Sequence, residues 1–126
     1  MKGVSMAVKV LVVEDEEDFH RLWKEEVGNN VEILSAYSIQ DAIALFNSNP
    51  DISMIVMDAC VPGNQQNTAP LVKWLREKFK GPLIATSSVP CFRVELLKAG
   101  CSHESQKRHV PKKVLELLES GIVSGH

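Results

Sequence analysis

The sequence predicts an α/β fold, a three-layer sandwich in which helices cover both faces of a five-stranded parallel sheet. Short apolar runs rich in β-branched residues alternate with longer stretches whose apolar residues recur every three or four positions. These are the periods of buried strands and of amphipathic helices. Clusters of Gly, Pro and Asn separate the segments. Strands that alternate with helices are joined by right-handed crossovers, so the sheet is parallel.

The first half of the chain supplies two strands and two helices. Residues 8–13 form a strand-like run, and a helical pattern over 19–27 ends at the Gly and Asn residues of 28–30. A short strand follows over 31–36. Ser38, with Asp41 three residues later, resembles a capping box that opens the second helix.

The second half supplies three strands and three helices. Residues 52–58 are an apolar run between chain breakers and are too short for a typical helix, so they predict a buried strand that ends at Asp58. Thr68 is expected to cap the next helix, with Pro70 in its first turn. The remaining segments are a strand over 83–86, a helix over 92–99 that ends at Gly100, a polar strand over 101–105, and a last helix that begins at Pro111.

Five such strands predict the flavodoxin-like order 2-1-3-4-5. Strands one and three are then neighbours, which puts the acidic turn after residue 13 beside Asp58. Ligands gather outside the carboxyl ends of the strands in open parallel sheets. This edge is therefore where we expect chemistry.

Composition restricts the classes of function. A chain of 126 residues suits one domain, which we expect over 8–119 with flexible termini at 1–7 and 120–126. The net charge of −2 gives no basic footprint for nucleic acid and no polybasic membrane anchor. Three cysteines without metal-site spacing indicate reduced thiols. We expect a cytoplasmic protein with neither a nucleic-acid nor a membrane partner.

Three acidic side chains are expected at the carboxyl edge of the sheet. Glu14 and Asp15 directly follow the first strand, where a nucleotide- or flavin-binding chain would carry glycines. Converging carboxylates form an oxygen-rich site suited to Mg²⁺ or Mn²⁺. With the metal bound, Asp58 is a candidate phosphoryl acceptor, because carboxylates form aspartyl-phosphates. Taken alone, Asp58 fits a turn or cap residue better than a phosphoryl acceptor, and the acids at 16–18 fit a helix start.

Four motifs occur in order along residues 8–118. They are Val10-Leu11-Val12-Val13-Glu14-Asp15-Glu16, Asp58 followed by Pro62-Gly63, Pro82-Leu83-Ile84-Ala85-Thr86-Ser87, and Ala99-Gly100 followed by Lys107. Together they resemble the receiver domain of response regulators, the CheY-like proteins of two-component signalling.

The resemblance implies that Asp58 accepts a phosphoryl group from a histidine kinase or a histidine phosphotransfer protein. Phosphorylation would switch a protein-interaction surface toward an unknown downstream protein. Asp15 and Asp58 would ligate Mg²⁺ (or Mn²⁺), with Glu14 acting through water and the Cys60 backbone carbonyl as a further ligand. The chain would catalyse only its own phosphoryl transfer and autodephosphorylation and would not otherwise be an enzyme.

The resemblance also assigns a hydroxyl and an ammonium group to the phosphoryl site. Ser87 falls at the position of the switch Ser or Thr that bonds the phosphoryl oxygen, and Thr86 is the alternative. Lys107 corresponds to the lysine that pairs with the phosphate.

Two positions depart from the family pattern. Arg108 stands where a cis-proline usually follows the lysine, and Glu104 stands where a switch Tyr or Phe is usual. They support an alternative hypothesis, a pseudo-receiver scaffold that binds partners without phosphorylation. The segment before Gly100 is also shorter than usual and contains Pro90, which predicts a helix that starts late or is irregular.

Other hypotheses have less support. A small phosphatase with an Asp nucleophile would carry a second Asp where Cys60 stands. His20 is expected on the surface of the first helix, and His103 and His109 lack metal-site spacing. We therefore expect a stand-alone receiver.

Overall fold

The structure, a computed structural model that describes residues 7–63 and 65–121, contains the predicted five-stranded parallel sheet. The strand order is β2-β1-β3-β4-β5, and each pair is parallel. Of the termini predicted to be flexible, residues 1–6 and 122–126 lie outside the described part. The strands are β1 (Val8–Val13), β2 (Val31–Ala36), β3 (Ile52–Asp58), β4 (Leu83–Thr86) and β5 (His103–Ser105), and the helices are α1 (Glu17–Val27), α2 (Ile39–Ser48), α3 (Ala69–Lys78), α4 (Pro90–Ala99) and α5 (Val110–Glu119).

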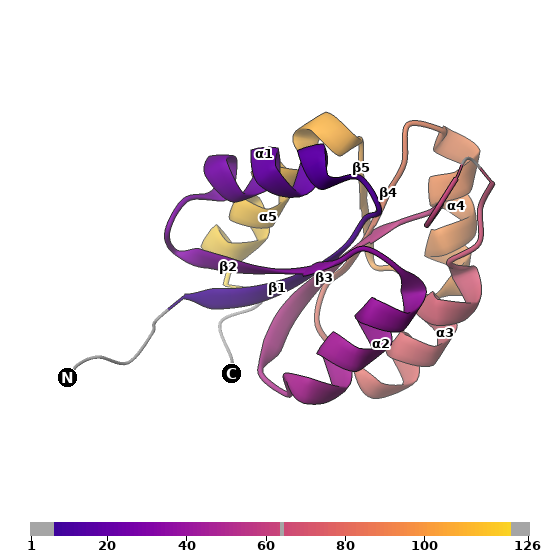
Figure 1. Ribbon diagram of the computed structural model, residues 1–126, viewed down its shortest axis with the longest axis horizontal. Helices are drawn as coiled ribbons and strands as arrows, with labels where there is room; N and C mark the ends of the chain where they lie inside the picture. The colour runs from indigo at the N-terminus through magenta and orange to yellow at the C-terminus, as the bar shows by residue number, and fades with distance from the viewer. Residues whose placement is uncertain (1–6, 64, 122–126) are drawn as a thin grey trace.

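Helices cover both faces of the sheet, as a three-layer sandwich requires. Figure 1 shows α1 and α5 on one face and α2, α3 and α4 on the other. Alternate residues of β3 enter the two cores: Ile55 and Met57 face α2 to α4, whereas Met54 and Val56 face α1 and α5. Because β3 is buried on both sides, its sequence is a nearly continuous apolar run.

The ends of several helices follow the local chemistry of their sequences. The Ser38 hydroxyl accepts a hydrogen bond from the Asp41 backbone N–H at 3.0 Å, as the predicted cap requires. The Asp41 carboxylate accepts one in return from the Tyr37 N–H, one residue earlier than in a standard capping box. Gly28 ends α1 at a positive φ of 78°, which favours glycine.

Three element predictions were wrong in detail. Helix α4 is neither late nor irregular: it begins at Pro90, because a proline at the first helical position loses no intrahelical bond. Strand β5 begins at His103, two residues later than expected, and its polar sequence suits an edge strand. Helix α5 begins at Val110 after a 3₁₀ turn, η1 (Lys107–His109).

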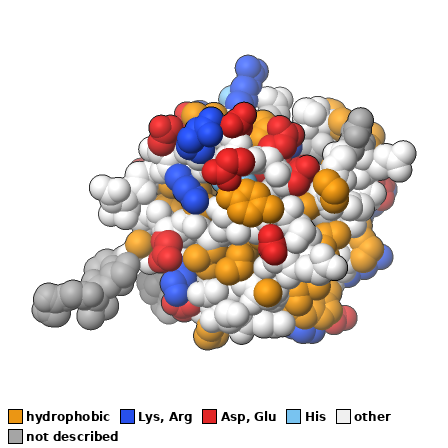
Figure 2. Space-filling model, viewed as in Figure 1, with side chains coloured by type: hydrophobic (Ala, Val, Ile, Leu, Met, Phe, Trp, Pro, Cys, Tyr) orange, Lys and Arg blue, Asp and Glu red, His pale blue; other side chains and the backbone are white. Residues whose placement is uncertain are grey.

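The face drawn in Figure 2 carries mixed charge. Red carboxylates gather in its upper half together with blue Lys and Arg side chains, and orange hydrophobic side chains lie between and below them. No helix in the described part of the chain has the length and apolar character that a membrane span requires.

The Ser38 cap gives a first prediction. Ser38→Ala removes the hydroxyl that satisfies the Asp41 N–H and should lower the free energy of unfolding by about 1 kcal/mol. The control is Ser48→Ala in the last turn of the same helix, where the hydroxyl only donates back to the Ala44 carbonyl. Urea unfolding should place Ser48→Ala near the parent, and equal losses in the two variants would contradict the cap assignment.

Candidate functional site

Three residues far apart in the sequence meet at the carboxyl edge of the sheet. Glu14 follows the last residue of β1, Asp58 ends β3, and Lys107 begins η1 after β5. The register pairs Val13 of β1 with Met57 of β3. Glu14 and Asp58 are the next residues along these two neighbouring segments. Glu14 is fully buried and Asp58 is 2% exposed. The predicted meeting of the acidic turn with Asp58 is thus observed.

The Lys107 ammonium lies between the two buried carboxylates. Its Nζ is 2.9 Å from Glu14 Oε1 and 3.3 Å from Asp58 Oδ2. The same nitrogen lies 4.7 Å from the centroid of the Phe19 ring, within range of a cation–π interaction. The positive charge of Lys107 therefore compensates the negative charge of both carboxylates.

The pKa values show that this compensation is incomplete. Burial raises the pKa of Glu14 to about 7, and the nearby Asp58 charge adds to the increase, although Lys107 opposes it. Burial also raises the pKa of Asp58, against the effect of Lys107. Burial by itself would lower the pKa of Lys107, but the hydrogen bond to Glu14 and the Asp58 charge raise it. The site favours a further positive charge.

The loop after Asp58 is held by residues to which sequence analysis gave no such role. The Thr68 hydroxyl does not cap α3 as predicted; it donates to the Asp58 backbone carbonyl at 2.8 Å. Asn67 accepts from the Val61 N–H at 2.8 Å and donates to the Val61 carbonyl at 2.7 Å. The Cys60 N–H donates to Asp58 Oδ1 at 3.3 Å. The sequence marks this role of Asn67 and Thr68 only by placing the two polar residues directly before a helix.

Two buried hydroxyls follow Asp58 on the neighbouring strand. Thr86 is the register partner of Asp58, and its hydroxyl has no hydrogen-bond partner within residues 7–63 and 65–121. Ser87 is 4% exposed, and its hydroxyl accepts from the Val89 N–H at 3.0 Å. Both hydroxyls keep a proton that they can donate.

His20 is not on the surface as predicted. Its side chain is fully buried, and Nε2 donates to the Glu14 carbonyl at 2.7 Å. The ring also packs on Tyr37, with centroids 4.4 Å apart. Burial lowers the pKa of His20, which favours the neutral ring. His20 therefore supports the backbone of the acidic turn.

The oxygen atoms at this edge fit a hard divalent cation. Carboxylate oxygens of Glu14, Asp15 and Glu16 lie within 4.8 Å of one another. Glu14 is already bonded, through Oε1 to Lys107 and through Oε2 to the Glu16 N–H. Asp15 makes no hydrogen bond or ion pair within the described residues. Oxygen donors are what Mg²⁺ prefers, and a cation would relieve the excess negative charge.

The pKa of Glu14 gives a prediction about stability. In magnesium-free buffer, the folded protein binds this proton with a pKa of about 7 and the unfolded chain with 4.5. The free energy of unfolding should therefore fall as pH rises from about 4.5 to 7. Glu14→Gln should remove much of that slope and gain about 1–2 kcal/mol at pH 8.

Urea unfolding at several pH values measures this effect. Glu25→Gln, at an exposed position of α1, is the control and should keep the slope of the parent. A Glu14→Gln variant with the parent's slope would show that the titration lies elsewhere.

Comparisons with known proteins give structural matches only. No family model matches the chain, and no curated protein matches it. A protein described as a two-component system response regulator/GGDEF domain protein superposes with a TM-score of 0.75 at 20% identity, over 92% of this chain and 51% of the other. This chain thus spans about half the length of that protein.

Two further structures match along nearly their whole length. A two-component response regulator from Clostridium difficile gives a TM-score of 0.76 at 18% identity, over 89% of this chain and 96% of the other. The N-terminal domain of an uncharacterized protein from Wolinella succinogenes gives 0.72 at 22% identity, over 90% and 92%. The chain thus has the flavodoxin-like fold of the receiver domains of two-component response regulators.

Proposed function

We propose that the chain is a phosphoacceptor receiver of a two-component phosphorelay, phosphorylated on Asp58 in a Mg²⁺-dependent reaction. The observation that carries the proposal is the buried Asp58 carboxylate at the carboxyl end of β3, with the Lys107 ammonium 3.3 Å away. Any buried carboxylate needs a charge partner, but a purely structural aspartate would not need the additional acidic cluster of Glu14, Asp15 and Glu16 beside it. The receiver fold supports the same assignment.

The transfer step needs one nucleophile and one charge partner. A carboxylate oxygen of Asp58 attacks the phosphorus of a phosphohistidine on the donor protein. The new P–O bond forms as the P–N bond breaks, and that electron pair leaves with the imidazole. Lys107 stabilises the charge on the transferring phosphoryl oxygens. In autodephosphorylation, a water oxygen attacks phosphorus and the Asp58 carboxylate leaves.

A bound Mg²⁺ would supply charge neutralisation between the nucleophile and the incoming phosphoryl group. Asp15, Asp58 and the Cys60 backbone carbonyl would hold it, with Glu14 acting through water.

Phosphorylation would act on the protein by local electrostatics. A phosphate on Asp58 adds about −1.5 to −2 charge and strong acceptor oxygens, which attract the Ser87 hydroxyl and the Lys107 ammonium. The loops after β4 and β5 then shift, and the surface they form with α4 and α5 changes its preference for a downstream protein. The domain performs its own phosphoryl transfer and autodephosphorylation and is not otherwise an enzyme.

The donor would be a histidine kinase or a histidine phosphotransfer protein in the cytoplasm, with no nucleic-acid or membrane partner for this domain. An open groove of about 620 Å³ is lined by Lys107, and the donor would approach the site from this side. Its walls include Phe19 from α1 and Pro90 from α4.

The second candidate is a pseudo-receiver scaffold. It is favoured by Arg108 and Glu104, which replace the usual proline and aromatic residue, and by the Lys107 contacts that already occupy Asp58 and Glu14. A scaffold of this kind would bind its partner equally well without phosphate.

The first test is adduct formation. With Mg²⁺ and acetyl phosphate, intact mass and peptide mapping should find one phosphoryl group on Asp58, and EDTA should prevent it. Asp58→Asn should form no adduct, whereas Asp18→Asn, at an exposed position of α1, should react as the parent does. An unreactive parent that binds its partner as Asp58→Asn does would instead establish the scaffold.

The second test decides which hydroxyl serves the phosphoryl group. Ser87→Ala should weaken beryllofluoride binding about tenfold, the loss expected for one hydrogen bond to a charged group. Thr86→Val keeps the shape of the neighbouring side chain and should bind nearly as the parent does. The reverse order of affinities in titrations followed by NMR would move the role to Thr86.

A further inference from the structure

We propose that Arg93 is a positioning residue for Ser87, and that its ion pair with Glu104 sets how easily Ser87 can turn toward a phosphoryl group on Asp58. The inference rests on the proposed function of Asp58 and Ser87. It assigns to Glu104 a role in the switch itself, although Glu104 has no aromatic ring.

One guanidinium joins three elements of the sheet edge. Arg93 lies on α4, and its Nη1 donates to the Ser87 backbone carbonyl at 2.6 Å. Its Nε donates to Glu104 Oε1 on β5 at 2.9 Å. The Arg93 side chain is only 13% exposed and its bond to the Ser87 carbonyl is partly buried, whereas the Glu104 side chain is 45% exposed, so the ion pair meets solvent on the Glu104 side. Residues at the end of β4, on α4 and on β5 are thereby coupled.

The chemistry of arginine suits this position. A planar guanidinium presents donors in fixed directions and can hold a carbonyl and a carboxylate together, which the single nitrogen of lysine cannot do in the same geometry. Glu104 also compensates a positive charge that would otherwise be desolvated. The register partner of Glu104 is Ala85, two residues before Ser87, which brings the carboxylate close to the loop.

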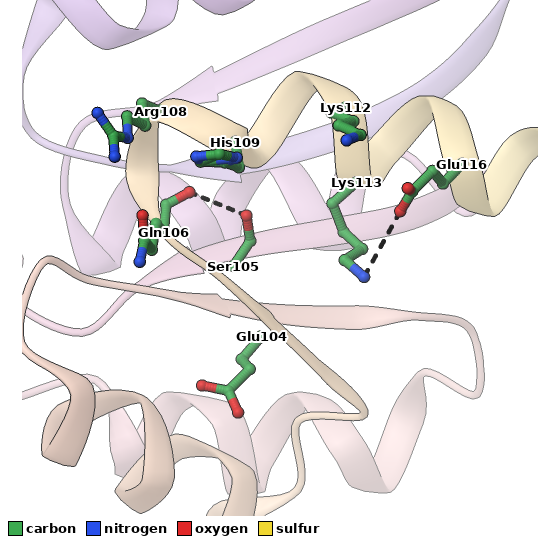
Figure 3. A pocket seen from close by; sticks show the side chains of 8 residues that line it. All are labelled: Glu104, Ser105, Gln106, Arg108, His109, Lys112, Lys113 and Glu116. Carbon is green, nitrogen blue, oxygen red and sulfur yellow. Dashed lines mark hydrogen bonds and ion pairs between the residues drawn. The ribbon is translucent and has the colours of Figure 1, made fainter.

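Glu104 is directed to α4 and not to the basic side chains of α5. In Figure 3 its carboxylate points away from Lys112 and Lys113. Lys113 pairs instead with Glu116 on its own helix, at 3.6 Å. Within the described residues, Arg93 is the cation that pairs with Glu104.

These contacts hold Ser87 in its present place. Arg93 fixes the Ser87 carbonyl, and the Val89 N–H fixes the Ser87 hydroxyl oxygen at 3.0 Å. In the proposed function the loop after β4 shifts when Asp58 is phosphorylated, and a shift of Ser87 toward the phosphoryl group would strain or break the Arg93 bond to its carbonyl. A contact that is made in only one of two conformations shifts the equilibrium toward that conformation. The ion pair therefore opposes the phosphorylated arrangement.

Beryllofluoride titration with Mg²⁺ tests this, with binding followed by NMR. Arg93→Gln should bind about threefold to tenfold more tightly than the parent, and Glu104→Gln about twofold to threefold. Arg93→Lys should fall between Arg93→Gln and the parent, since a lysine restores the charge but only part of the geometry. Lys98→Gln removes a cation from the same helix with no contact to Ser87 and should bind as the parent does.

Two combinations separate positioning from general loosening. The gain from Arg93→Gln should vanish in Ser87→Ala, because it depends on the freed hydroxyl. Arg93→Gln combined with Glu104→Gln should bind no more tightly than Arg93→Gln alone, since the two residues act as one unit. Weaker binding by Arg93→Gln, or a gain that survives in Ser87→Ala, would overturn the proposal.

The unliganded protein gives a readout that does not need Asp58 to react. Arg93→Gln and Glu104→Gln should displace the amide signals of Ser87 and Val89 in the same direction, and Lys98→Gln should not. If the parent forms no adduct while these shared displacements occur, the proposed function fails but the Arg93 contact to Ser87 stands. Displacements absent from both variants would overturn the positioning role whether or not Asp58 reacts.

Discussion

The site depends on one ammonium group between two buried carboxylates. Two carboxylates without a cation would repel each other and lose hydration, at a cost of several kcal/mol per ion. Lys107 Nζ compensates both Glu14 and Asp58 but leaves the cluster with a net negative charge once Asp15 and Glu16 are counted. Burial raises the pKa of Glu14 and the Asp58 charge adds to the increase, so the buried negative charge favours a divalent cation at the same edge. The buried negative charge is therefore the common cause of the raised pKa of Glu14 and of the expected affinity for a cation.

The core beneath the site fixes where this ammonium can be. Lys107 begins η1, which continues directly into α5, and α5 packs on α1 through Val110 and Trp23 in the core of that face. Phe19, one turn before Trp23 on α1, presents its ring to the ammonium. Packing between α1 and α5 therefore sets the reach of Lys107 toward β1 and β3. A change in this core would alter the site without touching a charged residue.

The strand order and the meeting of Glu14 with Asp58 could be predicted because they follow from short-range pattern and from parallel topology, whereas Lys107 was expected beside them only from the resemblance to receiver domains. The errors have local physical causes. Pro90 suits the first position of α4 and does not interrupt the helix, and the Thr68 hydroxyl donates to the Asp58 carbonyl instead of capping α3. His20 turns inward because the Glu14 carbonyl needs a donor. The pairing of Arg93 with Glu104 joins distant residues on the surface, where no periodicity marks a partner.

In the proposed function, acceptor chemistry and output use different parts of the molecule. Lys107 contacts Glu14 and Asp58, whereas the two departures from the receiver pattern, Glu104 and Arg108, lie on β5 and η1. At position 104, a carboxylate stands where receiver domains usually have an aromatic ring. An aromatic ring would be stabilised by burial of its apolar area, whereas Glu104 forms an ion pair with Arg93 and is about half exposed. Apolar burial depends little on salt, but a partly exposed ion pair is screened by it. The output of such a switch would therefore respond to ionic strength and to charged partners near Glu104, while the acceptor pocket, buried beneath it, would respond mainly to its cation.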